Sequence, residues 1–297
     1  GCRNPFRISV DSKTGWLFWG DVGPDVGKPH PKRGPESYDE FNLAKSPGNF
    51  GWPYFIADNK SYIDFDFQDS ISGKPFDPLK PENDSPNNTG QRFLPPAQPA
   101  LIYYPYGESK EFPAMGSGGR SAMAGPFYRS SDFNTQSKFP DYFDGKLFIY
   151  EWMREWIQTV SFDKEGKILK IEPFLPGLKW VHPIDMEFGK DGSLYILEYG
   201  TNWFTENDDA KLVKLEYAKG NRKPVANISA DKVLGAIPLK VKFSPVGSID
   251  YDGDSLQYEW EFGDSQKSTS SDKYPEFIFE KPGVYNVSLK VRDTKGK

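Results

Sequence analysis

The stretch "IDMEFGKDGSLYILEY", residues 184–199, shows the pattern that decides the fold of the first part of the chain. An apolar strand leads into a turn with charged residues and glycine, and an aromatic-aliphatic strand follows and ends in an acidic residue. Two earlier stretches repeat this pattern, "FRISVDSKTGWLFWGD" at residues 6–21 and "FPDYFDGKLFIYEW" at residues 139–152. All-β repeats of this size are typical of propeller blades. The sequence therefore predicts an all-β fold that contains a partial β-propeller of about three blades.

The beginning of the chain bears on the other blades of such a propeller. The sequence opens with "GCRNPF" rather than with methionine, and it enters the strand-turn-strand pattern at once. Three blades are too few to close a ring, and an open half-ring would expose two long strand edges, which proteins rarely leave uncovered. We therefore expect the remaining blades to lie upstream of Gly1 or in another chain.

The sequence pattern changes after "YAKGNRKPVANISA", residues 217–230. Apolar and polar residues alternate strictly in "LKVKF" at 239–243, "LQYEWEF" at 256–262 and "YNVSLKV" at 285–291. Such alternation predicts antiparallel strands with one buried face, and the turn signals between them indicate a small β-sandwich. The predicted organisation is a propeller part at residues 1–219, a linker at 220–223 and a β-sandwich at 224–297.

The composition restricts the partners of the protein. Aromatic residues make up 16% of the 297 residues, which favours packed β-structure and carbohydrate-like or planar ligands. A net charge of -5 provides no basic patch for phosphates, so we expect no nucleic-acid partner. No apolar stretch approaches membrane-spanning length, so we expect no transmembrane segment. Cys2 is the only cysteine and cannot form an internal disulfide, and we expect it to be a small buried side chain.

Several motifs resemble a known enzyme family. They are "RNPFRISVD" (residues 3–11), "GWLFWGDVGPD" (15–25), "ESYDEFN" (36–42), "PGNFGWP" (47–53) and "RSAMAGPFY" (120–128). Together they resemble the glucose/sorbosone dehydrogenase family, whose members are six-bladed β-propellers that use pyrroloquinoline quinone (PQQ). The resemblance covers roughly residues 1–217 and implies that this part is the C-terminal half of such a propeller.

The rest of the chain resembles a polycystic-kidney-disease (PKD) repeat, which is an immunoglobulin-like β-sandwich. The segments "WEFGD" (residues 260–264) and "PGVYNVSLKVRD" (282–293) carry this resemblance. The usual last strand of such a domain has no counterpart here. We therefore expect the sandwich to be truncated at its last strand.

The dehydrogenase resemblance implies roles for several residues. In the family an Arg-Asn pair contacts the quinone, and the carbonyls of a Gly-Pro pair help to hold Ca²⁺. These roles fall on Arg3 and Asn4, as cofactor-binding residues, and on the backbone carbonyls of Gly23 and Pro24, as metal ligands. A tricarboxylated quinone needs fixed cations, and Ca²⁺ prefers oxygen ligands. The family's general base lies upstream of the Arg-Asn-Pro motif, so no catalytic residue is assigned here, and the chain alone is expected to show no turnover.

Three further side chains are candidates for binding the cofactor or a sugar: Arg120 in "GSGGRSAMAG", Arg154 in "YEWMREW" and His182 in "WVHPIDMEF". The alternative for Arg120 is a salt bridge to Glu151 or Asp185. The aromatic and charged residues around Arg154 suit sugar stacking and packing between blades equally well. His182 stands where family members usually have an arginine, which puts quinone binding in question.

A second candidate metal site lies in the sandwich part. The segment "DYDGD" places Asp250, Asp252 and Asp254 at alternate positions, and PKD repeats sometimes bind Ca²⁺ in such loops. The alternative is an ordinary Asp-Gly turn between two strands. The sequence leaves both interpretations open.

Two functions are compatible with these features. The first is a fragment of a PQQ-dependent sugar dehydrogenase-like protein, which oxidises a sugar hydroxyl by hydride transfer and carries the PKD domain as a spacer or adhesion module. The second is a non-catalytic extracellular protein that binds carbohydrate on a propeller scaffold. Both predict a sugar or glycan as partner and a periplasmic, secreted or cell-surface location, and the first predicts PQQ and calcium as cofactors.

Overall fold

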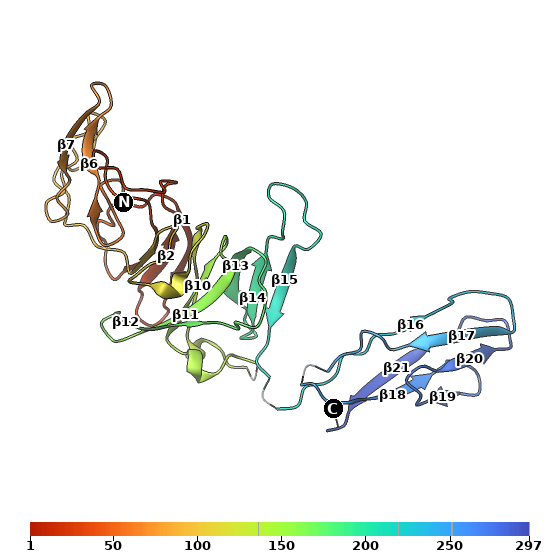
Figure 1. Cartoon of the computed structure of the whole chain (residues 1–297). Helices are drawn as coiled ribbons and strands as arrows, with labels where there is room; N and C mark the ends of the chain where they lie inside the picture. Colours follow the sequence, from red (N-terminus) through yellow and green to blue (C-terminus); the bar gives the residue numbers. More distant parts are fainter. Residues whose placement is uncertain (136, 219, 251, 297) are drawn as a thin grey trace. The chain divides into compact units, whose positions relative to one another are not determined.

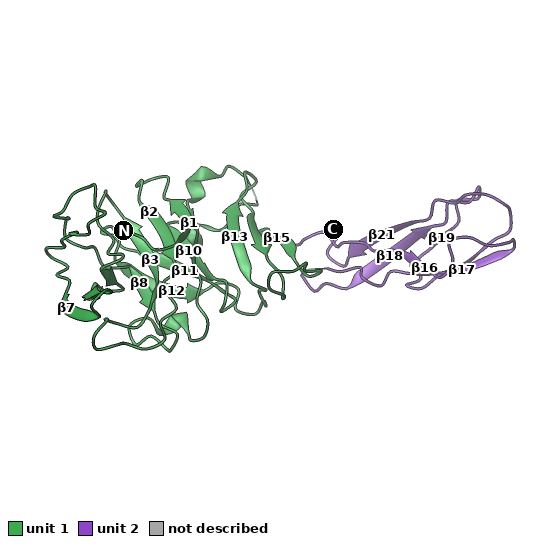
Figure 2. Ribbon diagram, turned by 90° about the horizontal axis from the view of Figure 1, so that it is seen from above, with its two compact units in different colours: residues 1–217 green, residues 218–297 purple. Residues whose placement is uncertain are grey.

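The computed structural model describes residues 1–297 except 136, 219, 251 and 297. The chain divides into two compact units, Gly1–Tyr217 and Ala218–Lys297 (Figure 2). In the described part of the chain, strands are joined by loops and three short 3-10 helices: η1 (Pro113–Met115), η2 (Ser130–Asp132) and η3 (Asp141–Phe143). The all-β prediction is confirmed.

Unit 1 contains three antiparallel sheets that follow one another along the chain (Figure 1). The first sheet has the order β1 (Pro5–Val10), β2 (Leu17–Asp21), β3 (Asp39–Ala44) and β8 (Ile102–Tyr104). The second has the order β9 (Ala122–Tyr128), β10 (Lys146–Glu151), β11 (Trp156–Phe162) and β12 (Ile168–Pro173). The third has the order β13 (Pro183–Phe188), β14 (Leu194–Glu198) and β15 (Lys211–Leu215). Strand β9 contacts both β1 and β13, so the first strands of the three sheets are neighbours, as in successive propeller blades.

The middle sheet is covered on both faces, and strand β10 shows how. All six of its residues are buried. Leu147 and Ile149 pack with Phe18 of the first sheet, whereas Phe148 and Tyr150 pack in a second core with Met186 of the third sheet. Successive side chains point to opposite faces of a strand, so a strand of the middle sheet contributes alternate residues to the core on each side. The three predicted blades are therefore present as packed layers.

The long segment between β3 and β8 forms two small hairpins, each a separate two-stranded sheet. They consist of β4 (Phe55–Ile56) with β5 (Lys60–Ser61), and β6 (Ile63–Asp66) with β7 (Ile71–Pro75). The buried Glu40 of β3 accepts a hydrogen bond of 2.5 Å from the backbone N–H of Ala57, which ties this segment to the sheet. Cys2 is exposed, contrary to the expectation of a buried side chain, because it lies ahead of the first strand.

Unit 2 is a sandwich of two three-stranded antiparallel sheets. One has the order β16 (Ser229–Ala230), β17 (Leu239–Ser244) and β20 (Glu276–Phe279), and the other β19 (Thr269–Ser270), β18 (Leu256–Glu261) and β21 (Ser288–Asp293). Val241, Phe243 and Trp260 form the buried core between them together with Phe262 and Phe279. The alternating pattern placed the first four of these inside, whereas Phe279 of β20 lies outside the three stretches that showed the pattern. The predicted strand at 285–291 begins only at Ser288, although Tyr285 still packs against the core.

Candidate functional site

The site residues predicted for unit 1 lie where its strands begin or end. Arg3 and Asn4 precede β1, Gly23 and Pro24 follow β2, Arg120 precedes β9, Arg154 follows β10, and His182 precedes β13. Near the beginning of β1, Arg7 Nε donates to the carbonyl of Ile184 near the beginning of β13 at 3.1 Å. Gly20, which pairs with Phe6 of β1, lies against Ala122 at the beginning of β9, so the starts of these three strands are adjacent. The backbone N–H of Trp152 also donates to the Ser121 carbonyl, 3.3 Å away, which joins the end of β10 to the start of β9.

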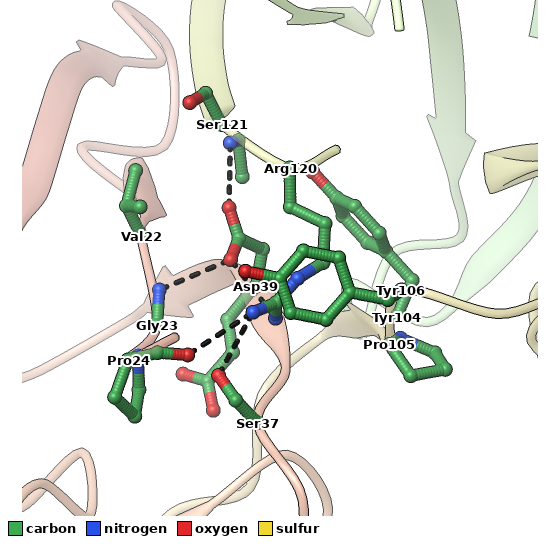
Figure 3. Close-up of polar contacts among 12 residues, drawn as sticks. Val22, Gly23, Pro24, Ser37, Asp39, Tyr104, Pro105, Tyr106, Arg120 and Ser121 are labelled. Atoms are coloured by element: carbon green, nitrogen blue, oxygen red, sulfur yellow. Dashed lines mark hydrogen bonds and ion pairs between the residues drawn. The ribbon is translucent and has the colours of Figure 1, made fainter. Parts of the chain in front are cut away.

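Arg120 forms a buried ion pair with Asp39, the first residue of β3 (Figure 3). Its Nη1 lies 3.1 Å from Asp39 Oδ1, and only 2% of the arginine side chain is exposed. The second terminal nitrogen donates to the Pro24 carbonyl at 3.1 Å and to the Ser37 hydroxyl at 3.0 Å. Arg120, predicted as a ligand-binding residue with a salt bridge to Glu151 or Asp185 as the alternative, thus forms a salt bridge with Asp39, which stands at the adjoining strand end.

Asp39 also binds two backbone N–H groups. Gly23 donates to its Oδ1 at 3.1 Å and Ala122 donates to its Oδ2 at 3.0 Å, so one carboxylate joins the first and second sheets (Figure 3). Burial raises the pKa of Asp39 to about 6, although Arg120 and the two N–H donors act in the opposite direction. The side chain is fully buried, and desolvation is the larger effect.

Arg154 uses its whole guanidinium group on backbone carbonyls. Its three nitrogens donate five hydrogen bonds, to the carbonyls of Pro105, Met115, Gly116, Gly118 and Gly119. A guanidinium has five N–H donors, so none is left for a ligand. The buried Glu151 beside it accepts hydrogen bonds from the Arg154 and Ser121 N–H groups and from the Tyr104 hydroxyl. Burial raises the pKa of Glu151 to about 7.

The residues near Arg3 form a more open arrangement. Arg3 is exposed, and its Nη1 donates to the Val22 carbonyl at 2.9 Å. Asp21 accepts from the backbone N–H groups of Arg3 at 3.1 Å and Asn4 at 2.6 Å, and burial raises its pKa. These bonds hold the segment before β1 against the end of β2.

The contacts of these residues do not suit PQQ and Ca²⁺, the two cofactors that the sequence analysis predicted. Arg120 is paired and almost inaccessible, and Arg154 has no free donor, so of the three predicted arginines only Arg3 has an accessible charge for a tricarboxylated quinone. The Pro24 carbonyl already accepts from Arg120 at 3.1 Å and from the Val26 N–H at 3.0 Å. A carbonyl oxygen has two lone pairs, and a cation already lies beside this one, so Pro24 is a poor ligand for Ca²⁺.

An aromatic cluster surrounds His182. The ring of Trp152 lies 4.6 Å from the His182 ring, 5.7 Å from Tyr199 and 4.9 Å from Trp203, and Phe204 follows at 5.9 Å from Trp203. The sequence prediction included only Trp152 and His182. The segment "EYGTNWF" at 198–204, with three aromatic residues after a strand, is the signal that could have indicated the others.

His182 has a defined orientation within this cluster. Its backbone φ is 47°, a left-handed conformation that is uncommon outside glycine. Its Nδ1 lies 2.9 Å from the Gly200 carbonyl, which can only accept, so Nδ1 carries the hydrogen. Nε2 faces Glu155 at 3.8 Å. The buried Nε1 of Trp152 has no hydrogen-bond partner in the described part of the chain.

The acidic residues predicted in unit 2 separate into two groups. The carboxylates of Asp250 and Asp254 converge with that of Asp293, with one oxygen from each within 4.8 Å of the others. Asp252 instead pairs with Arg222, whose Nη2 lies 2.9 Å away. The sequence prediction missed Asp293, which ends β21 and lies far from the loop along the chain. Calcium binding here stays a prediction.

Comparisons with known proteins give the following similarities. Residues 221–297 match the model of the PKD domain family, which confirms the PKD prediction. The chain is 38% identical over 77 residues to collagenase ColQ1 of Bacillus cereus (strain Q1), which covers 26% of this chain and 8% of that protein. It is 34% identical over 76 residues to collagenase ColA of Clostridium perfringens (strain 13 / Type A), with coverages of 26% and 7%. The chain thus spans less than a tenth of each of these relatives.

Solved structures similar to most of the chain are sugar dehydrogenases. A crystal structure of glucose dehydrogenase is 20% identical and has a TM-score of 0.40, with 73% of this chain and 46% of that chain covered. The PQQ-bound aldose sugar dehydrogenase of Streptomyces coelicolor is 14% identical and has a TM-score of 0.39, with coverages of 73% and 44%. This chain spans less than half the length of either. Both of these structures are named as sugar dehydrogenases, and the motifs described above resemble a family of such enzymes.

Proposed function

We propose that unit 1 binds a sugar or glycan at the aromatic cluster of Trp152, His182, Tyr199, Trp203 and Phe204. The observation that carries the proposal is the exposure of Trp203, a residue that is 49% accessible although its ring packs on the partly buried Trp152. A sugar ring presents C–H groups on its faces and hydroxyls at its edge. It therefore suits an aromatic face with a few polar groups beside it.

The polar groups beside the rings match the edge of a sugar. When the His182 ring is neutral, its Nε2 is an acceptor, because Nδ1 carries the hydrogen toward the Gly200 carbonyl. Glu155, 3.8 Å from Nε2, supplies further acceptors. A sugar hydroxyl is both donor and acceptor, so it can donate to these groups.

Oxidation of the bound sugar is the finer function that the family resemblance implies. It would require PQQ, with Ca²⁺ beside it, as the acceptor of hydride. The contacts of Arg120, Arg154 and Pro24 do not favour either group. The proposal is therefore limited to sugar binding and includes no redox step.

The location and the role of unit 2 follow from the same proposal. A glycan ligand places the protein in the periplasm, outside the cell or at the cell surface, and the PKD domain serves as a spacer or adhesion module. Among the described residues, no helix combines the length and the apolar character needed to cross a membrane.

Calorimetric titration of the full chain with a panel of sugars tests the proposal. We expect at least one sugar to bind, and Trp203→Ala to weaken its binding by about tenfold, the size of one stacking contact. Phe67→Ala is the matched control, because Phe67 is a 79% exposed ring beyond β6, outside the cluster. Absence of binding across the panel, or equal affinity of the Trp203→Ala variant, would reject the proposal.

A further inference from the structure

The rings of the aromatic cluster follow one another from the interior outward. Trp152 is partly buried, Trp203 is 49% exposed and Phe204 is 92% exposed. Trp203 contacts both of the others, with ring centres 4.9 Å from Trp152 and 5.9 Å from Phe204. Phe204 is therefore the outermost ring of a row, not a second layer over Trp152.

The loop that carries the two outer rings is held by its own side chains. Asp209 accepts from the Thr201 N–H at 3.1 Å and hydroxyl at 2.6 Å, and Asn207 accepts from the Asn202 N–H at 2.6 Å and donates to the Asn202 carbonyl at 2.9 Å. The loop contains Gly200 with a φ of 97°, where a side chain would collide with Asn207. These bonds fix the loop before any ligand arrives, which reduces the entropy lost on binding.

The backbone of Phe204 adopts an energetically unfavourable conformation. Its φ is 53°, a left-handed conformation that is unusual for a bulky residue, and its N–H donates to the Tyr199 hydroxyl at 3.1 Å. At 92% exposure the ring gains almost no free energy from burial in the protein. A strained, anchored and exposed aromatic ring suits contact with something outside the chain.

We propose, on the basis of the sugar-binding function above, that Phe204 forms a second sugar-binding position next to Trp203. The ligand is then a glycan of two or more linked rings, not a free monosaccharide. The separation of 5.9 Å between the two ring centres is comparable to the length of one sugar unit. The planes of Trp203 and Phe204 are turned by 77°, so the two linked sugar rings are also turned relative to each other.

The test compares glucose, maltose and maltotriose, in which successive rings are turned, by calorimetric titration of the full chain. We expect maltose to bind between about two- and tenfold more tightly than glucose, the gain of one further aromatic contact. Phe204→Ala should remove this gain, so that maltose then binds no more tightly than glucose. Phe204→Tyr should keep the gain, and Trp203→Ala should weaken the binding of all three. Circular dichroism melting of each variant checks that it is folded.

The possible failures of the two proposals differ. If the sugars bind but affinity does not increase from glucose to maltose, or if Phe204→Ala weakens both equally, the second position is rejected and the sugar-binding function stands. If cellobiose shows the Phe204-dependent gain and maltose does not, the turned arrangement is rejected. If no sugar binds at all, both proposals fall together.

Discussion

Arg120 and Arg154 show how the surroundings of a residue decide its role. Both follow or precede blade strands at positions that suit a ligand site, and both carry the charge that a cofactor carboxylate requires. In the folded chain one is paired with Asp39 and the other donates to five carbonyls. Each is therefore a positioning residue that joins loops to blades. Arg3 keeps an exposed side chain and remains a candidate for binding an anionic group.

Replacement of Arg154 tests its structural role. We expect Arg154→Ala to lower the free energy of unfolding by about 3 kcal/mol, because three partly buried carbonyls lose their donor and Glu151 loses a neighbouring cation. Arg3→Ala is the matched control and should change it by no more than about 0.5 kcal/mol, because Arg3 is exposed. Urea unfolding of both variants measures the difference. Equal effects would show that Arg154 does not hold its loop.

The buried acids of unit 1 predict how stability depends on pH. Burial raises the pKa of Asp39 to about 6, and of Glu40 and Glu151 to about 7. The folded state therefore keeps protons that the unfolded state releases above its ordinary pKa near 4. The free energy of unfolding should fall as pH rises from about 5 to 7 and then level off.

Acids with a lowered pKa act in a different pH range. Desolvation raises the pKa of Asp11, but the hydrogen bonds from Arg129, Thr14 and the Lys13 N–H together outweigh it and lower the pKa to about 2. Its stabilisation is complete above its ordinary value and is lost only in more acidic solution. Urea unfolding between pH 5 and 8 measures the contribution of the buried acids alone, because Asp11 stays ionised throughout this range. Glu151→Gln should make the free energy of unfolding depend less on pH. Stability that rises between pH 5 and 7 would contradict the prediction.

At the scale of elements, the loop before β18 and the end of β21 form one acidic site in unit 2. Buried oxygens of Asp250 and Asp254 have no hydrogen-bond partner among the described residues, and Lys295 lies 3.1 Å from Asp254. Asp293 is held by Asn221 from the beginning of the unit, so three separate segments meet. A divalent cation here would join them more firmly than Lys295 does.

Calcium should therefore stabilise unit 2. At a concentration of 100 times the dissociation constant, a ligand that binds only the folded state adds about 2.7 kcal/mol to the free energy of unfolding. We expect CaCl₂ to raise the melting temperature of unit 2 and EDTA to restore the original value. Asp254→Asn should abolish the shift, whereas Asp252→Asn should retain it, because Asp252 pairs with Arg222. A shift abolished only by Asp252→Asn would place the ion in the loop that the sequence alone suggested.

At the scale of the whole molecule, the chain consists of two units with separate cores. The two hydrophobic cores of unit 1 and the hydrophobic core around Trp260 in unit 2 share no residue. Domains with their own cores can fold independently. The proposed linker at 220–223 overlaps residues that belong to unit 2, since Asn221 and Arg222 bind Asp293 and Asp252.

Limited proteolysis tests this division. We expect the first cleavage to fall within residues 218–223, because the chain passes from one compact unit to the other at Tyr217–Ala218. Mass spectrometry should then detect two fragments that resist further digestion. Early cleavage within 256–262, inside β18, would contradict the division, since a strand in a packed sheet resists proteases.

Local patterns determined the strands, and long-range contacts decided the sites. The alternation in residues 256–262 and the repeated strand-turn-strand stretches predict antiparallel sheets, because a strand's period and a turn's glycine are properties of neighbouring residues. The same local sequence cannot specify that Asp39 pairs with Arg120, that Asp293 replaces Asp252 in the acidic cluster, or that Trp203 packs on Trp152. Those partners meet only when separate strands and loops are brought together. The sequence thus determined which segments become sheets, and the tertiary structure decided which charges are neutralised inside the protein and which rings remain open to a ligand.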